Sequence, residues 1–171
     1  SSIAVAALHA LEAHGLSRIA IVDFDVHHGN GTQDVLWSDA RVLFCSSHES
    51  PLFPGTGMAH ERGAHGNILN VPLPAQSDRT SFEAAYRDQI FPTVDQFAPE
   101  LLLVSAGFDA HLRDPLASLR LTTEDFSWIS AELVALANRH CGGRMVSMLE
   151  GGYDLTGLRD SVAAHLDALN A

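Results

Sequence analysis

Apolar and polar positions follow two different periods along this chain, one typical of buried strands and one typical of amphipathic helices. Short apolar runs bounded by polar or turn-forming residues predict strands, over residues 19–22, 42–45, 67–71, 101–104 and 145–149. Apolar residues spaced three or four positions apart predict helices between them, over residues 2–14, 32–38, 81–97, 122–140 and 155–169. Prolines and glycines predict a long loop over residues 49–66. Strands that alternate with helices are typical of an α/β domain with a mainly parallel sheet.

Capping residues and prolines indicate where some of these elements end. Thr32 is a candidate cap for helix 32–38, and Thr122 or Thr123 for helix 122–140. Pro72 is expected to close strand 67–71, and Pro92 to kink or divide helix 81–97.

Composition restricts the class of protein. With 171 residues, 46% hydrophobic and 18% charged, the chain is expected to form one packed domain over residues 1–171. A formal net charge of −11 argues against nucleic acid or an anionic membrane as partner and is compatible with a cationic substrate. Two cysteines are too few for a disulfide framework or a thiolate zinc site. No apolar run is long enough to cross a bilayer, and residues 1–15 lack a basic leader, so we expect a reduced, cytoplasmic location.

Chemically active side chains follow four of the predicted strands, where parallel sheets bind their ligands. Asp25 and His27 come after the first strand, Ser46 and His48 after the second, Asp109 after the fourth, and Tyr153 after the fifth. Asp23, Asp25 and His27 alternate, so they project to one side if the chain stays extended. These residues predict a metal half-site with Asp109 as third ligand, which leaves an open position on zinc. For each carboxylate alone, the alternative is a turn cap or an acceptor of backbone N–H groups.

Tyr153 follows the fifth strand and a pair of glycines that allow a tight bend. Its phenol is a candidate donor to a developing oxyanion. The alternative is a ring that covers the core while its hydroxyl meets water.

Five ordered motifs, which together cover essentially the whole chain, resemble the signatures of the zinc-dependent histone deacetylase family. The resemblance is strongest to the bacterial relatives of the class II enzymes, a group that includes acetylpolyamine amidohydrolases. The motifs are Asp23-Phe-Asp-Val-His-His-Gly-Asn-Gly-Thr-Gln, Phe53-Pro-Gly-Thr-Gly, Ser105-Ala-Gly-Phe-Asp-Ala-His, Asp114-Pro-Leu and Glu150-Gly-Gly-Tyr-Asp-Leu.

This resemblance implies the three-layer arginase–deacetylase fold and hydrolysis of the acetyl amide of acetyl-lysine proteins or acetylated polyamines. It implies one catalytic zinc held by Asp25, His27 and Asp109, and a Tyr153 that donates to the oxyanion.

The same resemblance implies further binding residues. Phe53 and Leu116 match residues that line the acyl-lysine tunnel, and Gly151 matches a position near the substrate's methylene chain. Asp23 and Ser46, with backbone atoms of Asp25, His27 and Ser47, match a structural monovalent-cation site, usually potassium.

One family feature is missing from this sequence. The family carries an adjacent histidine pair upstream, as general base and general acid, and Asp23 and Asn30 match the residues that orient it. We therefore expect a deacetylase-like domain shortened on its amino-terminal side, with reduced activity. We also expect an open sheet edge that a second copy or chain could pair with.

Two alternatives remain open at this point. One is a zinc-binding remnant or subunit without turnover. The other is a dinuclear manganese ureohydrolase on the related fold, which would need further bridging aspartates near Asp109.

Overall fold

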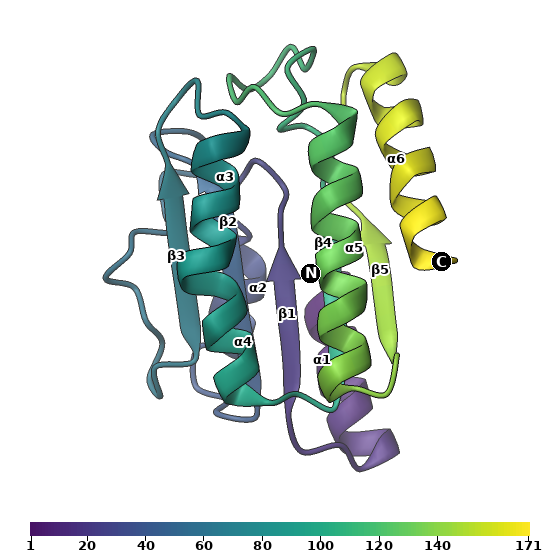
Figure 1. The fold of residues 1–171 in the computed structure, drawn as a ribbon. Coiled ribbons are helices and arrows are strands. Elements are labelled where there is room, and N and C mark those ends of the chain that lie inside the picture. Colours follow the sequence, from purple (N-terminus) through teal and green to yellow (C-terminus); the bar gives the residue numbers. More distant parts are fainter.

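The computed structural model describes all 171 residues and contains one five-stranded parallel sheet (Figure 1). The strand order is β3-β2-β1-β4-β5, and every neighbouring pair is parallel. The strands are β1 Ile19–Asp23, β2 Val42–Glu49, β3 Ile68–Leu73, β4 Leu101–Ala106 and β5 Met145–Leu149. All five predicted strands are present, which confirms the α/β class.

Helices cover both faces of the sheet and make three layers (Figure 1). One face carries α1 (Ser2–His14) and α2 (Asn30–Leu36). The other carries a long segment formed by α3 (Arg79–Ala85), the wide turn η1 (Tyr86–Ile90) and α4 (Phe91–Phe97), together with α5 (Thr123–His140). The last helix, α6 (Leu155–Leu169), packs against α5. None of the helices combines the length and apolarity that a membrane span needs.

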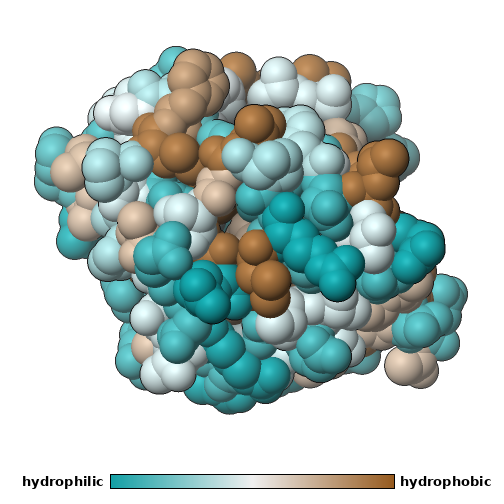
Figure 2. All heavy atoms as spheres, turned by 90° about the horizontal axis from the view of Figure 1, so that it is seen from above, coloured by the Kyte–Doolittle hydropathy of each residue, from teal (hydrophilic) through white to brown (hydrophobic).

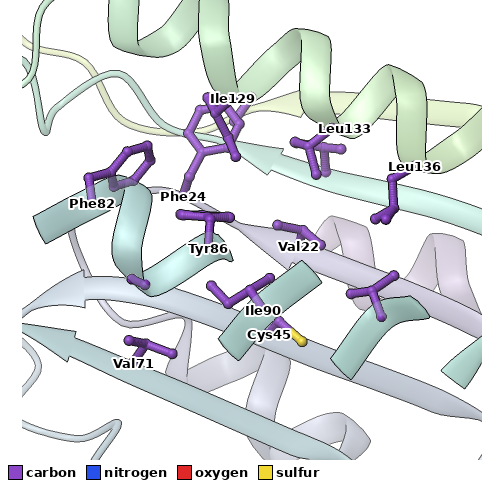
Figure 3. Close-up of a cluster of buried hydrophobic side chains, with 14 of the residues drawn as sticks. Val22, Phe24, Cys45, Val71, Phe82, Tyr86, Ile90, Ile129, Leu133 and Leu136 are labelled. Carbon is purple, nitrogen blue, oxygen red and sulfur yellow. The ribbon is translucent and has the colours of Figure 1, made fainter. Parts of the chain in front are cut away.

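Strand β1 is buried on both faces, as its uninterrupted apolar run predicts. Ile19 and Ile21 belong to the core under α1, whereas Val22 belongs to the core under α5. Figure 3 shows Ile129 and Leu133 of α5 above Val22 and Phe24. This packing holds the end of β1 in place.

Side-chain alternation continues beyond the end of β1. Phe24 and Val26 are both 1% exposed and belong to the core below α5. Asp25 and His27, between and after them, remain partly accessible to solvent. The expected separation of core and site side chains is therefore present, although the strand itself ends at Asp23.

Several element ends differ from those predicted. Helix α2 begins at Asn30 with Gly29 as its N-cap, so Thr32 is not the cap, and its hydroxyl pairs with Ser1 Oγ at 2.7 Å. Strand β2 continues to Glu49 instead of ending at Cys45. Strand β3 includes Pro72, because an edge strand tolerates a residue without an N–H.

The predicted helix 81–97 is present but starts earlier and is divided by the wide turn. Asp78 caps it by accepting from the N–H groups of Thr80 and Ser81. The Phe91 N–H bonds to Tyr86 O, five residues back, immediately before Pro92 in the first turn of α4. A wide turn at this point accommodates the proline, which lacks an N–H and would crowd the preceding turn.

The strand order reverses direction between β1 and β4. From β1 the chain moves outward to β2 and then β3, whereas β4 returns to the other side of β1 and is followed by β5. Connections that diverge in this way leave a crevice above the carboxyl ends of the two central strands, where open α/β sheets bind ligands.

Candidate metal centre

Three potential metal ligands meet in the crevice between the ends of β1 and β4. Asp25, His27 and Asp109 each offer an atom, and these atoms lie within 4.8 Å of one another. His27 Nδ1 is 3.1 Å from Asp109 Oδ2 and 3.2 Å from Asp25 Oδ1. No other group of three or more His, Cys, Asp or Glu side chains in the chain meets this criterion. The fold thus brings together the three residues that the sequence singled out.

Backbone N–H groups fix both carboxylates. Asp109 is fully buried, and its Oδ1 accepts from the Val26 N–H at 2.9 Å. Asp25 accepts from the His27 N–H at 2.8 Å through Oδ1 and from the Gly151 N–H at 2.8 Å through Oδ2. Each carboxylate therefore has its orientation set by the neighbouring loop, which is a property of a preorganised ligand.

The electrostatics of the centre favour a cation. Hydrogen bonds to Asp109 and then Asp25 raise the pKa of His27 to about 10. Burial raises the pKa of Asp109, although its hydrogen bond to His27 opposes this. Two carboxylates that hold a protonated imidazole between them form a place where a metal ion can replace the proton. One nitrogen and two carboxylate ligands are a donor set that zinc accepts, with room for a further ligand.

Two glycines make space for the carboxylates. A Cβ atom at Gly107 would overlap the Asp25 side chain, and one at Gly151 would overlap Asp109 Oδ2. Gly151 was expected only near the substrate chain, and Gly107 was not expected to matter. The sequence signal that could have identified Gly107 was its position two residues before Asp109.

Three exposed side chains belong to loops beyond the carboxyl ends of the strands, at the end of the molecule that Figure 2 views from above. Phe53 is 76% exposed, Leu116 56% and Tyr153 52%. The Phe53 ring lies 6.4 Å from the His27 ring between centroids. Partial burial, followed by the charges of Asp109 and Asp25, raises the pKa of Tyr153. The phenol therefore stays protonated and able to donate a hydrogen bond at neutral pH.

The residues expected to hold potassium lie beneath the metal centre. Asp23 and Ser46 are direct neighbours in the β1–β2 register. Asp23 is buried and accepts from the Asp25 N–H at 3.0 Å. The Ser47 hydroxyl instead pairs with Tyr86 at 2.9 Å, so only the Ser47 backbone remains for a cation. The carbonyls of Asp25 and His27 accept no hydrogen bond from the chain, which leaves them free as cation ligands.

Asn30 and Asp23 were expected to orient a histidine pair that this sequence does not carry. Asn30 is exposed at the start of α2, and its side chain forms no hydrogen bond within the chain. Burial, and then the charge of Asp25, raises the pKa of Asp23 well above its ordinary value. A polar cavity of about 280 Å³ adjoins Asp23 and Asp25, and Glu150 and Ser105 also line it.

The other histidines near the centre order loops. His28 pairs with Thr56 at 2.8 Å and with Gln33 at 3.0 Å, which ties the metal loop, residues 24–29, to the long loop over residues 49–66 and to α2. His48 pairs with Ser46 at 2.9 Å and donates to Gly57 O at 2.9 Å. Both ring nitrogens of each are engaged, so neither is an additional metal ligand.

Several known proteins are similar to this chain over most of its length. Residues 1–169 match the family described as the histone deacetylase domain. The chain is 44% identical over 171 residues to histone deacetylase 14, chloroplastic, of Arabidopsis thaliana, which covers 98% of this chain and 40% of that protein. It is 43% identical over 146 residues to a probable deacetylase of Archaeoglobus fulgidus, which covers 84% of this chain and 41% of that protein.

Solved structures agree with the fold. The HDA15 HD domain superposes with a TM-score of 0.91 at 37% identity, covering 98% of this chain and 48% of that one. The histone deacetylase Clr3 also gives a TM-score of 0.91, at 30% identity, covering 99% of this chain and 30% of that one. The architecture is therefore the arginase–deacetylase fold.

These matches define a class: the chain belongs to the histone deacetylase family. It spans about two fifths of the length of the plant and archaeal relatives named above.

Proposed function

We propose that this chain binds one zinc ion through Asp25, His27 and Asp109, in a site for hydrolysing the acetyl amide of acetyl-lysine or an acetylated polyamine. The observation that carries the proposal is the convergence of these three side chains at the point where the strand order reverses. Family membership supports deacetylation as the reaction class.

Zinc would supply Lewis acidity toward the acetyl carbonyl and activate water for attack. The residues of this chain prepare the site. The buried Asp109 and the backbone-bound Asp25 hold their carboxylates in place. Tyr153 keeps its phenolic proton and donates it in a hydrogen bond to the oxygen on which negative charge develops.

Phe53 and Leu116 would flank the substrate's methylene chain, since both expose apolar side chains and the Phe53 ring lies beside His27. The formal charge of −11 favours a substrate whose remaining groups are cationic, such as an acetylated polyamine or a lysine-rich protein segment. We also propose that a potassium ion binds to Asp23, Ser46 and the free carbonyls of Asp25 and His27. This ion would restrict the motion of the loop that carries the zinc ligands Asp25 and His27.

Zinc content and turnover test the proposal together. We expect about one zinc per chain after metal loading and dialysis, and release of acetate from an acetyl-lysine peptide or acetylspermidine. His27→Ala should lose both, whereas His14→Ala, an exposed helix residue, should keep both. Zinc retained by His27→Ala at the level of the unmodified chain would contradict the assignment.

A second function, zinc binding without turnover, is favoured by one feature of the site. His27 is assigned to the zinc and both nitrogens of His28 are engaged elsewhere, so neither imidazole is free to act as a general base or acid at the centre. General acid–base assistance typically contributes about 10²–10⁴-fold to a rate. Stoichiometric zinc with no acetate release would identify this alternative, and two metals per chain would point to a dinuclear site.

A further inference from the structure

We propose that Asp114 is a positioning residue that holds the loops of Tyr153 and Leu116 in register with each other beside the metal centre. The inference deepens the proposed deacetylase function and rests on it. It comes from one buried carboxylate that accepts hydrogen bonds from two different loops.

Asp114 uses one oxygen for each loop. Its Oδ1 accepts from the Leu116 N–H at 2.9 Å, within the loop that follows β4. Its Oδ2 accepts from the Tyr153 N–H at 2.8 Å, in the loop that follows β5. Asp114 is 8% exposed, so water competes little with its carboxylate for these two donors. A single carboxylate thus joins the residue proposed as oxyanion donor to a residue proposed to line the substrate chain.

The two loops need such a bond because the side chains of Leu116 and Tyr153 add little packing to hold them in place. The Tyr153 and Leu116 side chains are both more than half exposed and so gain little from core packing. Gly152, directly before Tyr153, has a φ of 145°, a conformation that few other residues adopt and from which the chain can easily depart. The Tyr153 N–H bond to Asp114 selects one arrangement of this bend.

An ordinary capping role would look different. Asp78, a typical cap, bonds only to the N–H groups of its own helix. Asp114 combines a local bond of this kind with a bond to a residue 39 positions away in the sequence. Removing Asp114 should therefore release Tyr153 as well as its own turn.

A second buried carboxylate provides a comparison. Glu49 accepts from the Ser118 N–H at 2.8 Å and from the Ser118 hydroxyl. It holds the far end of the segment that contains Leu116 but forms no bond with Tyr153. Loss of Glu49 should weaken substrate binding, whereas loss of Asp114 should also slow the chemical step.

The test is a double-mutant cycle in the zinc-loaded protein with an acetyl-lysine peptide. We expect Asp114→Ala to lower kcat by roughly 10- to 100-fold, because a misplacement of about 1 Å at a reacting group can cost about 10²-fold. In a Tyr153→Phe background the same change should lower kcat by less than about threefold. Asp78→Ala, the matched cap removal away from the site, should leave kcat unchanged, and Glu49→Gln should act mainly on KM.

The proposal is overturned if the kcat losses of Asp114→Ala and Tyr153→Phe multiply in the double variant, or if Asp114→Ala leaves kcat unchanged. Should Asp114→Ala fail to fold, Asp114→Asn is the second variant. It keeps the side-chain shape but replaces one of the two accepting oxygens with an NH2 group, so it can accept only one of the two hydrogen bonds. Amide hydrogen exchange at Tyr153 separates this inference from the proposed function. Faster exchange there in Asp114→Asn, but not in Asp78→Ala, supports the positioning role even if the unmodified chain releases no acetate, and unchanged exchange contradicts it.

Discussion

At the scale of the residue, the metal centre depends on glycines, which leave space for the carboxylates, as much as on the ligands themselves. Gly151 bonds through its N–H to Asp25 and lies directly against Asp109. Any larger residue would place a Cβ atom inside the carboxylate pair. The glycine is therefore required by contact, independently of whatever substrate lies above it.

Gly151→Ala should weaken zinc binding at least about tenfold and destabilise the fold by about 1–3 kcal/mol, since overpacking a tight site forces its neighbours to move. Gly31→Ala is the matched control, because nothing lies within 4 Å of its missing Cβ and alanine favours the helix there. Competition with a zinc-binding dye and urea denaturation measure the two effects. Equal zinc affinity in both variants would show that the carboxylates can shift without loss.

At the scale of the element, buried polar side chains join helices to the sheet. They fix the position of a helix where apolar packing alone would allow more than one. His165 of α6 pairs through Nδ1 with the Ser130 hydroxyl of α5 at 2.7 Å and through Nε2 with the Ser147 hydroxyl of β5 at 2.8 Å. The ring also packs edge-on against Phe24 and Phe108, the residues next to the metal ligands. The last helix is thus connected to the support of the site.

This connection should make stability depend on pH. Burial lowers the pKa of His165, so the unfolded chain binds a proton there at higher pH than the folded protein does. The free energy of unfolding should therefore be highest above about pH 6.5 and fall as the pH is lowered. Urea denaturation at pH 7 and pH 5 should show a smaller decrease for His165→Asn than for the unmodified chain or for His14→Asn. An equal decrease in all three would refute the assignment.

At the scale of the whole molecule, the two sheet edges differ. The outer strand β3 contains Pro72, which interrupts the row of donors that another strand could use. The outer strand β5 contains no proline and exposes Val146 by 50% and Leu149 by 60%. An apolar edge strand can pair with another strand, and we propose β5 as the edge where the pairing with a second copy or chain that the sequence analysis expects would take place.

Val146→Lys should reduce concentration-dependent association of the chain, because a charge on an edge strand opposes pairing. Val35→Lys changes the net charge equally at an exposed position on α2, a helix that packs against β2 on the other half of the sheet, and should not. Light scattering over a range of concentrations compares them. Reduced association in both variants would indicate a general charge effect instead of edge pairing.

The sequence by itself determined the order and type of the elements, because strand and helix periods are local properties that burial then enforces. It also marked Asp25, His27 and Asp109, since polar residues directly after apolar strands stand out in composition. The ends of β2 and β3 were less predictable. Pro72 is acceptable within β3 only because that strand lies at an edge, which depends on the strand order and not on neighbouring residues.

Only the tertiary structure decided how distant residues meet. Asp109 reaches His27 because β4 pairs with β1 and not with β3, a choice made by packing over the whole sheet. The role of Gly107 follows from the space beside Asp25, and that of Asp114 from a bond across 39 positions. Such contacts leave no local periodicity in the chain, since they arise only when separate strands and their loops are brought to one end of the same sheet.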